Sequence, residues 1–205
     1  MFLKKVNDFI TNDKFLYILL FIVALLINQH YASRGIFPID GFAHFDSGFR
    51  ILNGEYPIKD FWIVSGLFVD YLEALFFYLL GVSWKTHVIH SSLINGIITL
   101  ATYFVLRSVQ FKKIYSFLYS LFFGILAYPP SGTPFVDHHA TFLSLLGIYC
   151  FILALNSKGP QKKYLNSISS FDFILCSQFI ISINIYKNII TYSAAVVNRM
   201  TLKKL

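Results

Sequence analysis

Seven of the ten acidic residues of this chain fall in two stretches, each of which follows an apolar run. They are Asp40, Asp46, Glu55, Asp60, Asp70, Glu73 and Asp137. Carboxylates in two separate loops that meet at one surface can supply a general base in one loop and a partner or metal ligand in the other. External loops also carry acids because they are solvated, and this plainer interpretation applies to each of the seven.

Several of these acids have an ordinary structural explanation. Asp46 and Arg50 are four residues apart, the spacing of a helical ion pair that contributes roughly a few tenths of a kcal/mol. Asp40 suits the cap of a helix that follows it. Asp70 and Glu73 lie in an amphipathic segment, where we expect them to mark the face turned to water.

Residues 137–139 read Asp-His-His and combine a carboxylate with two imidazoles. These groups are hard-to-borderline ligands for a metal ion, so Asp137 and His138 are candidate metal ligands. The same residues also fit a helix cap followed by two interfacial histidines, and both interpretations remain open. His87 and His90 have no acid near them in the sequence, and we expect them to be interfacial anchors.

The composition predicts a membrane protein rather than a soluble one. Of 205 residues, 56% are hydrophobic and only 13% are charged, and the mean hydropathy is +0.62. Soluble domains carry about twice that charged fraction. The net charge of +7 comes from basic residues that flank apolar runs, not from a basic stripe with interleaved aromatics. We therefore expect no nucleic-acid partner.

Six apolar runs follow one another along the chain, at 15–33, 61–83, 87–109, 114–128, 140–155 and 168–185. Cytoplasmic loops concentrate Lys and Arg, and the basic clusters all share the cytoplasm if the second run lies along the interface instead of crossing. Asp70 and Glu73 in that run favour the same arrangement, because a carboxylate at the bilayer centre costs about 2.5–3.5 kcal/mol.

We therefore expect an all-α fold, a polytopic transmembrane bundle of about five spans with interfacial helices in its first external loop. Residues 1–160 form this module, with external loops at about 34–84 and 128–139. Residues 161–205 form a divergent segment with one further span. The expected location is the plasma (inner) membrane, with the N-terminus in the cytoplasm.

Three short motifs carry a resemblance to a known family. DGFA (40–43) opens the first expected loop, Arg50 follows, and Gly54 stands fourteen residues after Asp40. LNGEYPIKDFW (52–62), with LLG at 79–81, resembles the consensus G-x-x-P-Y-x-D-x-W … L-F-G with Tyr and Pro transposed. FVDHHA (135–140) falls where a second acidic motif is expected. In order and placement these motifs resemble the GT-C superfamily of membrane glycosyltransferases, which includes protein mannosyltransferases and aminoarabinose transferases.

The resemblance covers roughly residues 15–155 and implies a dolichyl- or polyprenyl-phosphate-dependent enzyme. Such an enzyme transfers a sugar to a lipid, glycan or protein acceptor outside the cytoplasm, in contact with membrane lipids. Asp40 would be the catalytic base that activates the acceptor hydroxyl. Asp137, with His138, would position the donor phosphate or a divalent metal ion, Mg²⁺ or Mn²⁺.

The resemblance also implies a substrate-binding set in the first loop. Arg50 is a candidate for the donor phosphate by its charge and planar geometry, with Asp46 beside it, although a plain surface role fits Arg50 equally. Tyr56 and Trp62 would stack on the sugar or the prenyl chain. The alternative for both rings is an aromatic belt at the membrane interface.

Only the N-terminal portion of the family pattern is present. Beyond Lys163 the sequence matches no motif of the family, which predicts either a truncated or frameshifted product, inactive in isolation, or a short native chain. Two other classes remain open. One is a non-catalytic membrane subunit or scaffold that uses the same loop surface for binding. The other is a small transporter, ranked last because transporters place ionisable groups at mid-membrane.

Overall fold

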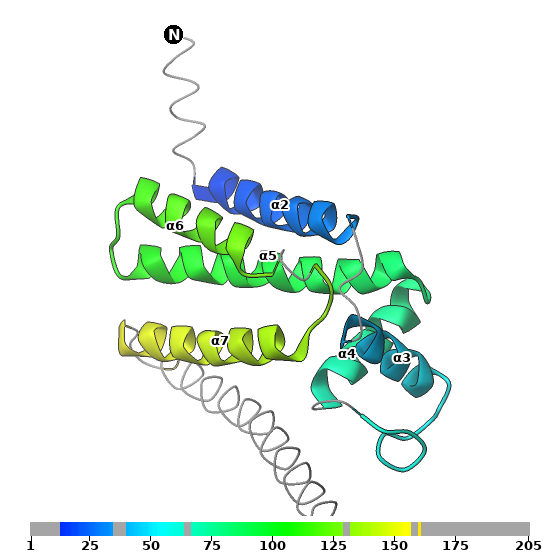
Figure 1. Cartoon of the computed structure of the whole chain (residues 1–205). Helices are drawn as coiled ribbons and strands as arrows, with labels where there is room; N and C mark the ends of the chain where they lie inside the picture. Colours follow the sequence, from blue (N-terminus) through cyan, green and yellow to red (C-terminus); the bar gives the residue numbers. More distant parts are fainter. Residues whose placement is uncertain (1–12, 35–39, 64–66, 129–131, 157–159, 161–205) are drawn as a thin grey trace, which may run out of the picture.

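The fold is all-α, as the sequence predicts. The computed structural model describes residues 13–34, 40–63, 67–128, 132–156 and 160. Within them lie six helices and no strand (Figure 1). These are α2 (Asp13–Ala32), α3 (Asp40–Leu52), α4 (Leu67–Leu80), α5 (Trp84–Ser108), α6 (Lys113–Leu126) and α7 (Val136–Asn156).

Three of the described helices are long and apolar enough to cross a membrane. They are α2, α5 and α7, and α6 is apolar but shorter. They correspond to the apolar runs expected at 15–33, 87–109 and 140–155, so a membrane protein with a helical bundle is consistent with the fold. The run expected at 168–185, and the whole of 161–205, lie outside the described residues.

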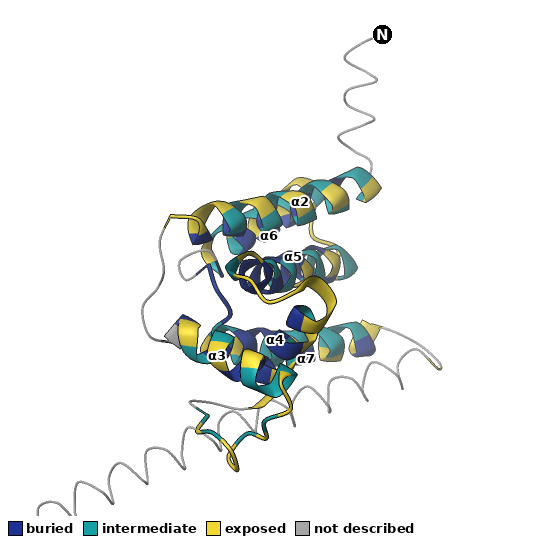
Figure 2. Ribbon diagram, turned by 90° about the vertical axis from the view of Figure 1, so that its right-hand side faces the viewer, coloured by how far each residue is buried: buried dark blue, intermediate teal, exposed yellow. Residues whose placement is uncertain are grey.

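Helix α5 is the centre of the bundle. Figure 2 looks nearly along it, with α2 and α6 on one side and α3, α4 and α7 on the other. Small residues allow the closest approaches, as is common where helices pack in membranes. A Cβ atom added at Gly96 of α5 would lie 2.7 Å from the Phe21 ring of α2, and one at Gly124 of α6 would lie 2.6 Å from Thr99 Oγ1 of α5.

A buried amide joins the same three helices. The Asn95 side chain donates to the backbone carbonyls of Ala24, at 3.1 Å, and Gly124, at 2.9 Å. Because a polar group without a partner is costly in an apolar interior, these bonds favour one register of α2 and α6 on α5.

Helices α3 and α4 pack on each other at the end of the bundle where α5 begins (Figure 1). The apolar run expected at 61–83 is therefore interrupted. Its helix is only Leu67–Leu80, and Ser83 then caps α5 by accepting a hydrogen bond from the Thr86 backbone N–H at 3.1 Å. A positive φ of 84° at Gly81 makes the turn between α4 and α5, a conformation that glycine adopts without strain.

Candidate functional site

A buried group of ionisable side chains lies where α3, α4, α5 and α7 meet. We call it the acid–histidine cluster, and it consists of His44, Asp70, Glu73, His87, His90, Tyr128 and His139. None of its members is more than 3% exposed. Burying an ionisable group is costly unless partners satisfy it, so the contacts of this cluster matter for stability. Among the described residues, neither ring nitrogen of His87 has a hydrogen-bond partner.

Asp70 joins α4 to α3. Its Oδ1 lies 2.7 Å from His44 Nδ1, and both side chains are buried. Burial raises the pKa of the Asp70 carboxyl above its ordinary value, and the hydrogen bond and charge of His44 only partly oppose this.

Glu73 joins α4 to α5 through two imidazoles. Its Oε2 lies 2.6 Å from His90 Nδ1, in a hydrogen bond. Its Oε1 lies 2.9 Å from His87 Nδ1, close enough for an ion pair although the angles are not those of a hydrogen bond. Burial raises the pKa of Glu73, but its close contacts with the ring nitrogens of His87 and His90 outweigh burial and lower the pKa to about 2.

His139 brings the start of α7 to the cluster. Its Nε2 lies 3.1 Å from His90 Nε2. Its Nδ1 lies 2.9 Å from the Tyr128 hydroxyl and 3.0 Å from the Phe135 carbonyl oxygen. The Phe135 backbone N–H in turn donates to the Tyr128 hydroxyl oxygen at 3.0 Å. The cluster therefore ties α4 and α5 to Tyr128 and to the start of α7.

Two sequence expectations are wrong at this cluster. Asp70 and Glu73 do not face water, and are 1% and 0% exposed. His87 and His90 do have an acid nearby, because the tight turn at Gly81 folds α4 back onto α5. A signal was present in the sequence: two acids three residues apart precede two histidines three residues apart, so each pair lies on one face of a helix.

The expected substrate-binding residues lie apart from this cluster, at the end of α3 and in the loop that follows. Arg50 Nε donates to Asp46 Oδ2 at 2.7 Å, and Nη1 donates to Glu55 Oε2 at 3.1 Å. The bonds to Asp46 and then Glu55 raise the pKa of the Arg50 guanidinium. Tyr56 and Trp62 are 63% and 69% exposed, so neither ring belongs to the core.

The helix that begins at Asp40 abuts the segment that leads to Asp137. A Cβ atom added at Gly41 would lie 3.0 Å from Thr133 Oγ1. Residues 132–133 are held there from the bundle, since the Gly132 carbonyl accepts hydrogen bonds from Ser91 Oγ at 2.7 Å and Asn28 Nδ2 at 3.2 Å. Two segments more than 90 residues apart in the chain thus lie side by side.

The expected metal ligands occupy different surroundings. Asp137 is exposed at the start of α7, whereas the half-buried His138 ring stacks on Tyr128 with ring centroids 4.9 Å apart. Across the described ranges, no group of three or more His, Cys, Asp or Glu side chains is arranged to hold a metal ion. A divalent metal ion held by Asp137 and His138 stays a prediction.

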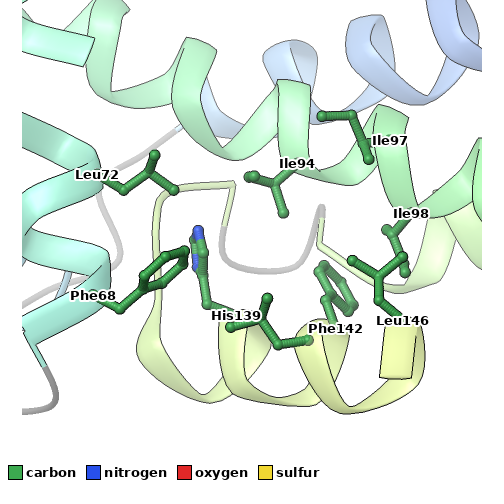
Figure 3. Close-up of a pocket in the computed structure, with 9 residues that line it drawn as sticks. Phe68, Leu72, Ile94, Ile97, Ile98, His139, Phe142 and Leu146 are labelled. Carbon is green, nitrogen blue, oxygen red and sulfur yellow. The ribbon is translucent and has the colours of Figure 1, made fainter. Parts of the chain in front are cut away.

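A small cavity of about 80 Å³ lies between α4, α5 and α7 (Figure 3). Its walls include Phe68, Leu72, Ile94, Ile98 and Phe142. Of the described residues that line it, His139 alone has a polar side chain. The imidazole that closes the chain of contacts to Glu73 therefore also forms one wall of an otherwise apolar space.

Comparison of the chain with protein-family models, curated proteins and solved structures finds no match.

Proposed function

We propose that the chain is a membrane glycosyltransferase of the GT-C type. It transfers a sugar from a polyprenyl-phosphate donor to a lipid, glycan or protein acceptor on the non-cytoplasmic face. The observation that carries this proposal is the contact between the start of α3 and Thr133. It brings the helix that opens at Asp40 next to the segment that leads to Asp137, as the two acidic motifs require.

In the proposed topology α2, α5, α6 and α7 cross the plasma (inner) membrane. Helices α3 and α4 lie along the outer interface. Support comes from their position beside the start of α5, while Arg107, Lys112 and Lys113 gather where α5 ends and α6 begins (Figure 1). The positive-inside rule assigns that basic turn, and the N-terminus, to the cytoplasm.

The proposed chemistry is a displacement at the anomeric carbon. The Asp40 carboxylate takes the proton of the acceptor hydroxyl, the hydroxyl oxygen forms the new glycosidic bond, and the polyprenyl phosphate leaves with the electron pair of the broken bond. Arg50 contributes positive charge for the leaving phosphate, and Asp137 positions that phosphate directly or through Mg²⁺ or Mn²⁺. The fully buried acid–histidine cluster takes no part in bond making and instead holds α3 and α4 in place.

The test is Asp40→Asn in the full chain reconstituted in liposomes. Polyprenyl-phosphate mannose and polyprenyl-phosphate aminoarabinose serve as labelled donors, with extracted membrane lipids as acceptors. We expect turnover to fall by about 100-fold or more, because a general base contributes about 10²–10⁴-fold. The matched control is Asp13→Asn, an acid at the start of α2 that lies outside both acidic motifs and should leave turnover unchanged. Unchanged turnover in Asp40→Asn would contradict the proposal.

A second candidate is a non-catalytic membrane subunit that uses the same surface for binding. The large exposed rings of Tyr56 and Trp62 favour it, since aromatic side chains often anchor interfaces. This candidate predicts no sugar transfer from either donor in the wild-type chain. It also predicts that Asp40→Asn leaves the set of co-purified membrane proteins unchanged.

A further inference from the structure

Helix α4 has the reverse of the amphipathic pattern that a helix on a water-soluble protein shows. Its two charged residues, Asp70 and Glu73, are buried against α3 and α5. The opposite face of α4 carries large exposed apolar side chains at helical spacing and no charged residue. These side chains are Leu67, Tyr71, Leu75, Tyr78 and Leu79.

The exposed face of α4 has the chemistry of a surface that meets lipid. A contiguous apolar patch marks contact with a partner or a membrane, because water is a poor cover for it. In helices within a bilayer, ionisable residues turn toward the protein and apolar residues toward the acyl chains. Helix α4 has this arrangement, with both of its carboxylates turned to His44, His87 and His90. The distribution of charge therefore favours lipid as the cover.

Helix α4 also runs back along α5 instead of away from it. After the turn at Gly81 is traced backward, Glu73 contacts His87, and Phe68 near the start of α4 lines the cavity together with Ile94 (Figure 3). A helix rises 1.5 Å per residue, so His87 and Ile94 differ by about 10 Å along α5. The start of α4 therefore lies beside the interior part of a helix that is long and apolar enough to cross a membrane.

The exposed face of α4 is continuous with the exposed surface of α5. Phe68 of α4 and Ile97 of α5 are both exposed, and both line the cavity whose other walls include Leu143 of α7. Helices α5 and α7 are both candidate membrane spans. When α5 crosses a bilayer, the acyl chains that surround Ile97 also reach Phe68.

We propose that α4 dips into the bilayer at an angle, with its exposed face against acyl chains and its two carboxylates turned to protein. Its first residues lie deepest, and Gly81 lies nearest the membrane surface. A helix lying flat on the surface would instead hold all its exposed residues at one depth. The leaflet is the one at the start of α5, which the proposed topology assigns to the non-cytoplasmic side. The lipid contact itself does not depend on sugar transfer.

The first experiment measures what surrounds the exposed face. The full chain carries Cys150→Ala and Cys176→Ala, and a nitroxide spin label is attached to Leu75→Cys in liposomes of phosphatidylcholine and phosphatidylglycerol. Collisions with oxygen, which concentrates among acyl chains, are compared with collisions with a water-soluble nickel chelate. Ile148→Cys on the exposed face of α7 is the lipid reference, and Asn53→Cys, exposed just after α3, is the water reference.

We expect the ratio of oxygen to nickel collisions at Leu75→Cys to match that at Ile148→Cys and to exceed that at Asn53→Cys several-fold. A ratio equal to that at Asn53→Cys would show that the face meets water, and would overturn the inference. Poor access for both oxygen and nickel would show that protein covers the face, a second copy or another partner, and would also overturn it.

The same labels test the angle of α4. Leu67→Cys, Leu75→Cys and Leu79→Cys place the label near the start, the middle and the end of the exposed face. We expect the oxygen-to-nickel ratio to fall from Leu67→Cys to Leu79→Cys, because the end of α4 lies nearest the membrane surface. Equal ratios at the three positions, or a ratio that rises toward Leu79→Cys, would overturn the angled insertion.

A second measurement needs no cysteine. The chain has two tryptophans, Trp62 and Trp84, and with both replaced by Phe a single new tryptophan reports its own surroundings. We expect lipids brominated on their acyl chains to quench the fluorescence of Tyr71→Trp strongly and that of Asn53→Trp weakly. Equal quenching of the two variants would overturn the inference. Neither measurement uses a sugar donor, so a failure of the proposed function leaves both results unchanged.

Discussion

The segment between α2 and α5 contains two acid-rich regions that contrast sharply. In α4, Asp70 and Glu73 are fully buried and each contacts imidazole. Around the end of α3, Asp46 and Glu55 share the Arg50 guanidinium in exposed or half-exposed positions. The residue types overlap, and only the surroundings differ.

The contrast teaches which acids stabilise the fold and which are available to a ligand. Exposed ion pairs contribute about 0–1 kcal/mol, because water screens them and ordering long side chains costs entropy. When a buried acceptor is removed, each donor that it paired with is left without a partner. Each such donor lowers the free energy of unfolding by about 1–3 kcal/mol. The buried region is therefore structural, whereas the side chains of the exposed region remain accessible to solvent.

The largest effect is expected for Glu73→Ala. It removes the acceptor of His90 and the ion-pair partner of His87, and we expect the free energy of unfolding to fall by about 2–4 kcal/mol. Unfolding in mixed micelles, followed by fluorescence, measures this, because Trp84 lies against His87 with ring centroids 5.1 Å apart. Glu55→Ala is the matched control and should cost less than about 1 kcal/mol. Similar losses of unfolding free energy in Glu73→Ala and Glu55→Ala would contradict the expected difference between buried and exposed acids.

Lowering the pH should also separate the buried acids from the exposed ones, without any mutation. The pKa of Glu73 is lowered from 4.5 to about 2, so its contribution is complete above about pH 4.5 and is lost as the pH falls toward 2. This amounts to up to about 3 kcal/mol. The raised pKa of Asp70 acts in the opposite direction, favouring the fold at low pH and opposing it as the pH rises. Unfolding curves between pH 2 and 6 (roughly the range that matters) should lose much of their acid dependence in Glu73→Gln.

A smaller effect is expected for Gly48→Ala, which tests the packing of α3 on α4. A Cβ atom at Gly48 would lie 2.7 Å from Glu73 Cγ and 2.9 Å from Glu73 Cβ. The glutamate backbone would have to shift, and we expect a loss of about 1–3 kcal/mol in unfolding free energy. Asp46→Ala, on the exposed face of the same helix, controls for the change in helix propensity. A stabilised Gly48→Ala variant would show that α3 can move away from α4 at little cost.

The smallest effect on stability is expected for Arg50→Ala. Its partners are exposed or half-exposed, so the free energy of unfolding should change by less than about 1 kcal/mol. If Arg50 contacts the donor phosphate, the KM for the donor should nevertheless rise. A large loss of stability would instead place Arg50 among the structural residues.

Much of the helix pattern was predictable from the sequence. The runs at 15–33, 87–109 and 140–155 became α2, α5 and α7, because an apolar stretch of that length has few alternatives to a helix that buries its own backbone bonds. The run at 61–83 was predicted less well. The run is apolar throughout, so its hydropathy does not show the turn at Gly81 between the end of α4 and the start of α5.

The acid–histidine cluster was not predictable in the same way. Asp70 and Glu73 are three residues apart, so they lie on one face of a helix. The spacing alone does not show whether that face contacts water or another helix. Hydropathy describes each residue by itself. The burial of a charged group depends on partners that lie elsewhere in the chain, here His44, His87 and His90.

The sequence by itself determined the all-α class and the apolar helices, because both follow from local composition and from the need of every backbone polar group for a partner. It also identified the acids and the candidate loops. Only the tertiary structure decided which acids are buried with histidines, which remain exposed beside Arg50, and that Gly41 meets Thr133. Those outcomes depend on contacts between segments far apart in the chain, whose geometry local sequence patterns do not encode.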